Sequence, residues 1–444
     1  MENESVIKPE DVHGIIGTRM LADGFDIVLD LKKSKGTRMY DSKNERFLLD
    51  FFGFFASNPI GFNHPKMSDP DFMEDLKLAA LTKVTNSDIY TKQMAEFVDT
   101  FTRETSPEFM KYLFLISGGA LAVENGLKAA FDWKVRKNQM YGEKGVVGSK
   151  IMHLKEAFHG RSGYTMSLTN THDPRKTMYF PKFDWPRVTN PKLRFPVTEK
   201  VLKDVEEQEE RSIAEMEQNF QKFSSDIAAF IMEPIQGEGG DNQFRKEYFK
   251  RVEKLVREND SLFMVDEVQS GMGVTGKWWA FQHYDIKPDI LSFGKKSQVC
   301  GIMAGERMDE VKDNVFKVSS RINSTWGGNI VDMVRAKRYV EIMVEESLIK
   351  NAEKMGKILV NELIALSDEF PNLVSNARGV GLMDAFDLRT EKIRDEFFDR
   401  MFAKGVLILK AGELTIRLRP ALILSQEDIK EFIAIAREVL RELR

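Results

Sequence analysis

The sequence predicts an α/β protein that has a large domain with a mostly parallel sheet flanked by helices, and a smaller α+β domain built from both termini. In the middle of the chain, short apolar runs alternate with amphipathic stretches, which is typical of parallel strands joined by crossover helices. After Asn329 this alternation gives way to long helices and short strands. We therefore assign residues 76–335 to the large domain, and residues 1–75 and 336–444 to the small domain.

The expected elements follow in order along the chain. Residues 25–31 and 47–55 predict strands of the small domain, and the phenylalanines of the second stretch favour a core or subunit interface. A helix is expected at residues 121–137, where apolar residues share one face, and charged and closing helices at 199–222 and 426–443. Six strands are expected in the large domain, at residues 111–116, 151–154, 227–232, 262–265, 290–293 and 302–304.

Composition and charge exclude several classes of protein. The 65 Lys and Arg residues against 69 Asp and Glu give a net charge of −4, so no basic excess favours nucleic acid as a partner. Cys300 is the single cysteine, which excludes an intrachain disulfide, and the scattered histidines predict no metal site. We find neither a secretory signal nor an apolar run of the roughly 20 residues that a membrane span requires. A cytoplasmic protein without a membrane partner is expected.

One glycine motif resembles a dinucleotide fingerprint. Residues 271–276 match G-x-G-x-x-G and follow an apolar run. The fingerprint requires a helix that opens within the glycines and an acid beyond the next strand, whereas a short aromatic stretch follows here. An NAD-dependent oxidoreductase is therefore only a rival hypothesis.

A stronger signal is an acid and a lysine that follow neighbouring apolar runs. Asp266 ends the run after residue 262, and Lys295 follows the run at 290–293. In α/β sheets such strand ends share one edge, where ligands bind. Pyridoxal phosphate chemistry requires this pair, because the lysine forms a Schiff base and shuttles protons while the acid keeps the pyridine nitrogen protonated. A salt bridge at the sheet edge is the alternative interpretation.

Two further motifs follow strands of the same expected sheet. Ser-Gly-Gly-Ala at residues 117–120 precedes a helix, so backbone N–H groups and the helix dipole could meet a phosphate there. Ala-Phe-His-Gly-Arg at residues 157–161 offers Phe158 for stacking on a flat cofactor and Arg161 for a carboxylate. A tight turn and a packed loop with a solvated arginine are the structural alternatives.

These motifs belong to a set of longer matching segments. On this basis the sequence resembles the class III pyridoxal-phosphate aminotransferases of fold type I across nearly its whole length, and among them it looks most like the lysine ε-transaminases. The matching segments are residues 54–58, 118–125, 157–164, 180–187, 233–240, 293–300 and 324–329.

The resemblance implies roles for the residues around the cofactor ring. Lys295 would be the Schiff-base lysine; Lys296 beside it is the competing candidate, but the spacing from the preceding Pro-Asp favours Lys295. Asp266 would pair with the pyridine nitrogen, as the residue pattern also indicates. Gln269 would hydrogen-bond to the phenolic oxygen.

The resemblance also implies how the rest of the cofactor is held. Gly119 and Ala120 would hold the phosphate through backbone N–H groups. Phe158 would stack on one face of the ring and Val268 would pack on the other. A threonine that corresponds to Thr325 reaches the phosphate in the neighbouring subunit in similar enzymes, so a homodimer with shared sites is expected.

Substrate binding would have to solve a geometric problem. Lysine presents its ε-amine to the cofactor, whereas glutamate and 2-oxoglutarate present the α-carbon. By resemblance, Arg161 would hold the distant α-carboxylate of lysine, with help from Asn323. Arg417 would hold the α-carboxylate of glutamate, and Glu238 would pair with Arg417 while lysine reacts, then swing aside. A structural ion pair is the alternative for these last two residues.

The expected reaction is a ping-pong transamination. The ε-amino group of L-lysine would pass to 2-oxoglutarate through pyridoxal 5′-phosphate, giving 2-aminoadipate 6-semialdehyde and glutamate. Another class III ω-aminotransferase, acting on ornithine, 4-aminobutyrate or diaminobutyrate, is the nearest rival.

Overall fold

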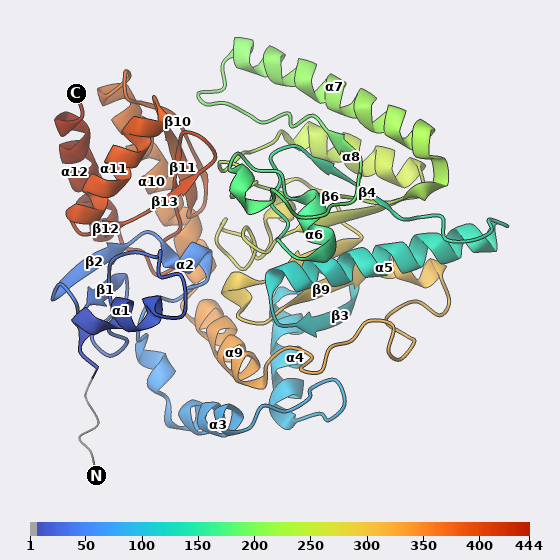
Figure 1. Ribbon diagram of the computed structural model, residues 1–444, viewed down its shortest axis with the longest axis horizontal. Helices are drawn as coiled ribbons and strands as arrows, with labels where there is room; N and C mark the ends of the chain where they lie inside the picture. Colours follow the sequence, from blue (N-terminus) through green and yellow to red (C-terminus); the bar gives the residue numbers. More distant parts are fainter. Residues whose placement is uncertain (1–6) are drawn as a thin grey trace.

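A seven-stranded mixed sheet forms the centre of the larger part of the protein, as the computed structural model shows for residues 7–444 (Figure 1). Five neighbouring strands run parallel, from β5 (Arg187–Val188) to β8 (Ile290–Phe293), and the remaining two are antiparallel to their neighbours. In sheet order the strands are β3 (Met110–Ile116), β9 (Cys300–Gly305), β8 (Ile290–Phe293), β7 (Leu262–Asp266), β6 (Ile227–Met232), β4 (Lys150–Leu154) and β5 (Arg187–Val188). All six strands expected in this region are confirmed.

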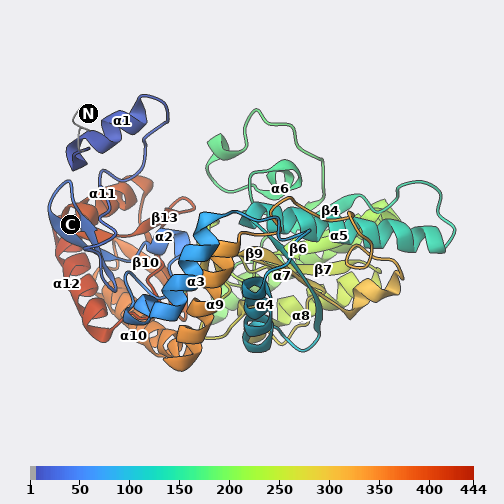
Figure 2. The same ribbon diagram turned by 90° about the horizontal axis from the view of Figure 1, so that it is seen from below.

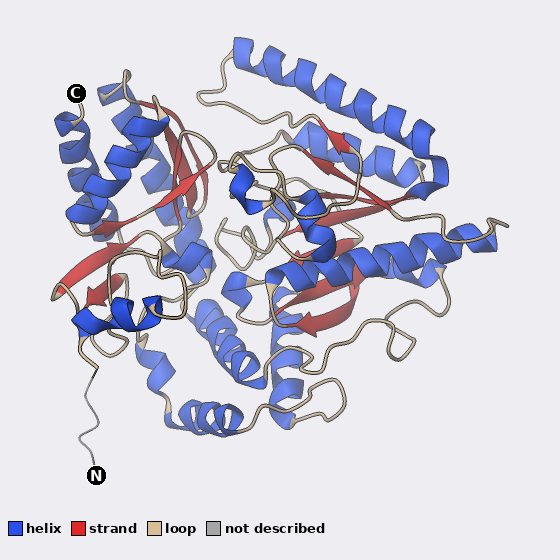
Figure 3. Cartoon of the chain, viewed as in Figure 1, coloured by secondary structure: helices blue, strands red, loops and turns tan. Residues whose placement is uncertain are grey.

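Helices cover both faces of this sheet, so its strands are buried on both sides (Figure 3). Successive residues of β6 show the alternation, because Phe230 packs into one apolar cluster and Ile231 into the other. The first cluster includes residues of α4 (Lys92–Thr105), α7 (Glu199–Phe223) and α8 (Lys246–Glu258), and the second includes residues of α5 (Gly119–Met140). Near-continuous apolar strands are the expected consequence of burial on both faces.

Two smaller sheets lie beside the large one (Figure 1). The antiparallel sheet has the order β10 (Val374–Val380), β11 (Met383–Leu388), β14 (Thr415–Leu418) and β13 (Leu409–Ala411). The other has the order β1 (Arg38–Asp41), β2 (Arg46–Asp50) and β12 (Val406–Leu407). Strands β2 and β12 pair in parallel, and Phe51 stacks on Phe432 with ring centroids 4.4 Å apart. Segments from the two ends of the chain therefore share one sheet and one core.

Helices α10 (Leu348–Glu369), α11 (Glu391–Ala403) and α12 (Gln426–Glu442) lie beside the two smaller sheets, whereas α6 (Gly163–Leu168) packs against α5 of the large part (Figure 2). Helix α12 begins with a capping box, in which the Asp428 N–H donates to Ser425 Oγ at 3.1 Å and the Ser425 N–H donates to the Asp428 carboxylate at 3.0 Å. The remaining helices are α1 (Val12–Gly17), α2 (Gly53–Ala56), α3 (Pro70–Leu81) and α9 (Ile330–Glu345).

The expectation of strands near the N-terminus is only partly right. Residues 25–31 form no strand beyond an isolated bridge at Leu29, because their apolar side chains pack singly against a small cluster that includes Phe52. Residues 47–55 contribute to β2 and then turn sharply at α2. The domain division at residues 75 and 335 stays a prediction; α9 continues through residue 335, and residues 1–6 lie outside the described part.

Within residues 7–444, no helix combines the length and the apolar character needed to cross a bilayer.

Candidate active site

The expected site residues gather at one edge of the large sheet. Parallel strand β7 ends at Asp266, and β8 ends just before Gly294 and Lys295. At the same edge β3 leads into α5, which begins at Gly119. A Cβ built on Gly294 would lie 3.4 Å from Val268 Cγ1 and 3.6 Å from Gly119 Cα, so three separate loops meet there. This is the edge at which α/β sheets bind ligands.

Lys295 carries an amine that loses its proton readily. Its pKa is lowered from 10.5 to about 8, mainly by burial and then by the positive charges of Arg417 and Arg419, while Glu238 and Asp266 oppose this effect. Its backbone has φ 52°, a left-handed conformation that is costly for a residue with a Cβ. A strained, partly buried amine with a perturbed pKa is typical of a nucleophilic lysine.

Lys296 has different surroundings. Its side chain is buried, and its Nζ has no hydrogen-bond partner among residues 7–444. Burial, followed by the charges of Arg419 and Lys295, depresses its pKa far below the ordinary value. The carboxylates that face Lys295 do not contribute to the perturbation of Lys296.

Asp266 is fixed by three hydrogen bonds. His159 Nδ1 lies 2.8 Å from Asp266 Oδ2, and the Ser292 hydroxyl and the Val268 N–H each donate to Asp266 Oδ1 at 3.1 Å. The His159 side chain is fully buried, so it orients the carboxylate without contact with solvent. The sequence analysis did not name His159 as a site residue, although it lies inside the motif at residues 157–161 that supplied Phe158 and Arg161.

The start of α5 presents bare backbone at the same edge. A Cβ added to Gly119 would lie 2.8 Å from Val268 Cγ1, and one added to Gly160 would lie 2.6 Å from Ala120 Cβ. Gly118 has φ 111°, which a residue with a side chain rarely adopts. No side chain caps the first turn of this 22-residue helix. Its free N–H groups and its dipole therefore favour an anion there.

Glu233 holds the loop that carries Phe158, the residue expected to stack on the cofactor. The Phe158 N–H donates to the Glu233 carboxylate at 2.9 Å, and the Gly237 N–H donates to it at 3.0 Å. Burial raises the pKa of Glu233 to about 7, with His159 and the two N–H groups opposing that rise. Glu233 thus ties the Phe158 loop to the loop that leads to Glu238.

The side-chain oxygen of Gln269 accepts hydrogen bonds from two arginines. Arg419 donates to Gln269 Oε1 from Nε at 3.1 Å and from Nη2 at 2.9 Å, and Arg417 Nη1 lies at 3.4 Å. Gln269 Nε2 has no such bond among residues 7–444, so this amide can donate to a bound group.

Glu238 lies between two cations. Its Oε2 is 2.6 Å from Arg417 Nη2 on β14, and its Oε1 contacts Lys176 Nζ. Burial raises the pKa of Glu238, but Arg417 and Lys176 outweigh that effect and the net pKa is lowered. The pairing of Glu238 with Arg417 was expected. Lys176 was not, because it lies in a polar loop where a lysine gives no sequence signal.

Phe55 is a third residue, after His159 and Lys176, that was not expected in the site. Its ring centroid is 5.7 Å from Lys295 Nζ and 6.0 Å from Arg417 Cζ. Residues Gly53–Ala56 all have positive φ, so α2 is a left-handed turn that directs this ring toward the site. A Cβ on Gly53 would lie 2.1 Å from the Arg419 carbonyl oxygen, which leaves no room for another residue.

Residues 21–440 match the family model described as aminotransferase class III. The chain belongs to this family. It is 48% identical over 433 residues to the L-lysine-epsilon aminotransferase of Mycobacterium tuberculosis, covering 97% of this chain and 96% of that protein. It is 28% identical over 452 residues to human mitochondrial 4-aminobutyrate aminotransferase, covering 95% and 87%.

A solved structure of this class III aminotransferase family agrees closely with the fold. Lysine aminotransferase from M. tuberculosis in the internal aldimine form superposes with a TM-score of 0.96, at 48% identity, over 99% of this chain and 100% of that one. The fold expected from the sequence is confirmed. The rival oxidoreductase is not supported, because residues 271–276 form turns and no helix opens within the glycines.

Class III aminotransferases use pyridoxal 5′-phosphate, and the site of this aminotransferase fits that cofactor. Lys295 offers a readily deprotonated amine, and Asp266 is a carboxylate fixed by His159. The start of α5 offers uncapped N–H groups at a position where neither Gly119 nor Gly160 has room for a side chain. These are the three groups that a pyridine aldehyde with a phosphate requires.

Three expected site residues form no hydrogen bond or ion pair with Lys295, Glu238 or Arg417 among residues 7–444. Arg161 is exposed and forms no ion pair with residues 7–444. Asn323 accepts a hydrogen bond from the Ser324 N–H at 2.8 Å. Thr325 is exposed on the same loop, and its carbonyl oxygen lies 3.4 Å from the Ser87 hydroxyl. The roles expected for these three residues stay predictions.

Proposed function

We propose that the enzyme transfers the ε-amino group of L-lysine to 2-oxoglutarate, giving 2-aminoadipate 6-semialdehyde and glutamate. The observation that carries the proposal is the Glu238–Arg417 ion pair beside Lys295, with its 2.6 Å separation. Arg417 can either pair with Glu238 or bind a substrate carboxylate, which suits a site that alternates between substrates with one and two carboxylates. The relatives at 46–48% identity are named L-lysine-epsilon aminotransferases, which supports the same substrate.

Each substrate state requires a different arrangement of charge. While lysine presents its ε-amine, the inner end of the site receives only methylene groups, and Glu238 neutralises Arg417. When glutamate or 2-oxoglutarate binds, its α-carboxylate takes Arg417 and Glu238 moves away. The planar guanidinium of Arg417 suits this carboxylate because it can form two parallel hydrogen bonds.

Pyridoxal phosphate supplies, when bound, an aldehyde that takes the amino group and a ring that accepts electrons from the neighbouring carbon. Asp266 would keep a proton on the pyridine nitrogen, and His159 would hold Asp266 in place. Lys295 Nζ would take the proton from the reacting carbon of the substrate and return it to the adjacent position. Gly119 and Ala120 would hold the phosphate, and Gln269 Nε2 would donate to the phenolic oxygen.

Four further residues would contact the cofactor ring or the substrate. Phe158 would stack on one face of the ring, and Val268 would pack on the other. Arg161 would bind the α-carboxylate of lysine, with Asn323 beside it.

We also propose a homodimer in which Thr325 binds the phosphate of the partner subunit. The exposure of Thr325 and of Trp326 beside it supports this arrangement, because both would be covered by a partner. Mixing a Lys295→Ala variant with a Thr325→Val variant would restore activity if sites are shared. A cytoplasmic location stays a prediction from the sequence.

A survey of half-reactions tests the function. Lysine, ornithine, 4-aminobutyrate and diaminobutyrate are each mixed with the holoenzyme, and conversion of the cofactor to its amine form is followed by absorbance. Lysine is expected to have the highest kcat/KM, with Lys295→Ala inactive toward all four. A higher value for one of the other three amines would replace lysine as the substrate.

A further inference from the structure

Lys176 forms the second contact of Glu238, and no role has been assigned to it. Resting on the proposed function, we infer that Lys176 is a positioning residue that keeps the Glu238 carboxylate paired when a dicarboxylic substrate takes Arg417. It lies at the end of a short 3-10 turn, Pro174–Lys176, whose first residue follows the capping side chain of Asp173. Lys176 would thereby favour glutamate and 2-oxoglutarate over lysine.

The two oxygens of Glu238 contact different cations. Oε2 faces Arg417 Nη2 at 2.6 Å, and Oε1 faces Lys176 Nζ. The Arg417 side chain is 2% exposed and also contacts Gln269, whereas the Lys176 side chain is 25% exposed. A lysine has a flexible four-carbon stem, so Lys176 can follow the carboxylate when it turns away from the fixed guanidinium.

A charge count shows why this second cation matters. With lysine at the site, Arg417, Lys176 and Glu238 together carry one net positive charge. The α-carboxylate of glutamate brings this total to zero, so each carboxylate has one cation. Without Lys176, the same state holds two carboxylates and one cation. Glu238 is only 18% exposed, so water compensates poorly for the missing partner.

The backbone that carries Glu238 is fixed, so the side chain must make the movement. Arg419 pairs with both carboxylate oxygens of Asp241, and Arg378 donates to the Asp241 carbonyl at 3.1 Å and to the Gly240 carbonyl. The Gly412 N–H donates to the Glu238 carbonyl at 3.1 Å. Movement of Glu238 is thereby limited to rotation of its side chain.

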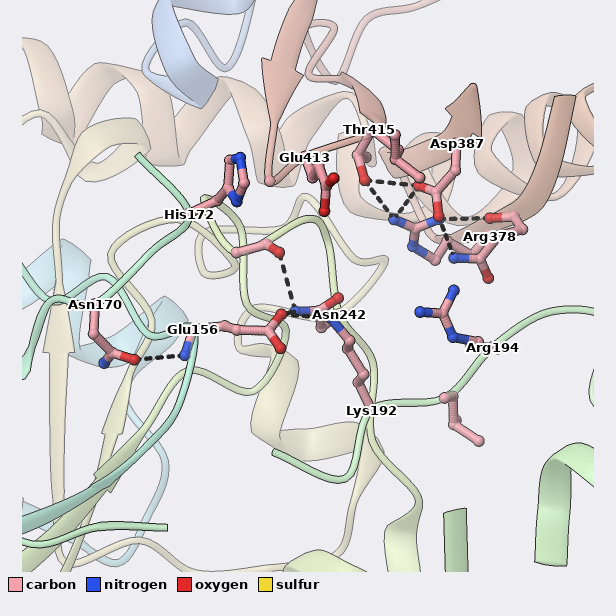
Figure 4. Close-up of a pocket in the computed structure, with 15 residues that line it drawn as sticks. Glu156, Asn170, His172, Lys192, Arg194, Asn242, Arg378, Asp387, Glu413 and Thr415 are labelled. Carbon is pink, nitrogen blue, oxygen red and sulfur yellow. Dashed lines mark hydrogen bonds and ion pairs between the residues drawn. The ribbon is translucent and has the colours of Figure 1, made fainter. Parts of the chain in front are cut away.

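Arg378, which donates to this loop, is itself held by Asp387 and Thr415. Figure 4 shows its guanidinium between Asp387 and Thr415 at the wall of a polar cavity of about 330 Å³ that Gly239 and Asn242 also line. Arg378 Nη2 lies 3.0 Å from Asp387 Oδ1 and 3.2 Å from Thr415 Oγ1. The loop is therefore held between buried arginines rather than by solvent-exposed contacts.

Binding of glutarate tests the inference, since this dicarboxylate cannot transfer an amino group. Calorimetry on the holoenzyme is expected to show about tenfold weaker glutarate binding in Lys176→Gln, corresponding to the loss of one charge-assisted contact. Lys176→Arg keeps the charge and should retain at least half of the wild-type affinity. Arg175→Gln is the matched control, because the exposed Arg175 pairs with Asp173.

Single-turnover kinetics give an independent readout on the same cofactor form. In Lys176→Gln, the KM for glutamate should rise about tenfold while the KM for lysine changes less than twofold. In a Glu238→Ala background, Lys176→Gln should change neither value further, because Lys176 acts through Glu238. Thermal unfolding of each variant checks that the fold is intact.

Unchanged or tighter glutarate binding in Lys176→Gln would overturn the inference, as would equal loss for lysine and glutamate. An effect of the same size in the Glu238→Ala background would also overturn it. These results differ from failure of the proposed function, in which the wild-type enzyme itself would not convert lysine or would not accept 2-oxoglutarate.

Discussion

The perturbed amine of Lys295 predicts a specific pH dependence for cofactor attachment. With the ordinary pKa of 10.5, about one lysine in 3,000 is neutral at pH 7, whereas a pKa of about 8 makes about one in 11 neutral. Because the neutral amine is the nucleophile, the rate at pH 7 should gain about 300-fold from the surroundings of Lys295. The sign follows from the lowered pKa: the reactive form increases as pH rises and is dominant above about 8.

The assay mixes the cofactor-free protein with pyridoxal phosphate between pH 6 and 9.5 and follows the absorbance change of covalent attachment. The rate should rise about tenfold per pH unit at the acidic end and level off above about pH 8. A rate that still rises tenfold per unit at pH 9.5 would refute the reasoning. In Arg417→Gln, a positive charge that opposes the ammonium form is lost, so the midpoint should move to higher pH.

Three further predictions concern substrate binding, cofactor chemistry and stability. Arg161→Ala should raise the KM for lysine at least tenfold and leave glutamate less affected, and equal loss in both half-reactions would contradict its role. His159→Leu removes the 2.8 Å contact to Asp266 and should lower kcat about tenfold or more and shift the cofactor absorbance, whereas an unchanged spectrum would speak against it. Arg419→Leu leaves Asp241 buried without its partner, so guanidinium unfolding should show a loss of about 3–5 kcal/mol; a loss below about 1 kcal/mol would be inconsistent with a buried pair.

The cofactor end of the site could be predicted because its chemistry follows the strands. Asp266 and Lys295 each end a run of apolar residues that can only be buried, and the parallel sheet places such ends at one edge. The helix that begins at Gly119 was also predictable, because apolar residues share one face and the glycine pair Gly118-Gly119 marks its start.

The residues that the sequence analysis missed act through geometry that no local pattern encodes. Phe55 faces Lys295 because four successive residues adopt a left-handed backbone. Phenylalanine rarely adopts this conformation, so the sequence did not indicate it. Lys176 reaches Glu238 from a loop without periodicity, where a lysine is usually solvated. The stretch 25–31 has the composition of a strand, but it pairs with β1 only through an isolated bridge between Leu29 and Asp41.

The pairing of β2 with β12 has a consequence for the order in which the protein folds during synthesis. β2 leaves the ribosome early, but its partner strand and the Phe432 ring that stacks on Phe51 belong to the last part of the chain. The large sheet, from β3 to β9, is complete well before that point. The N-terminal strands must therefore wait, with their apolar faces uncovered, until translation is almost finished, and this interval is when aggregation and chaperone binding are expected.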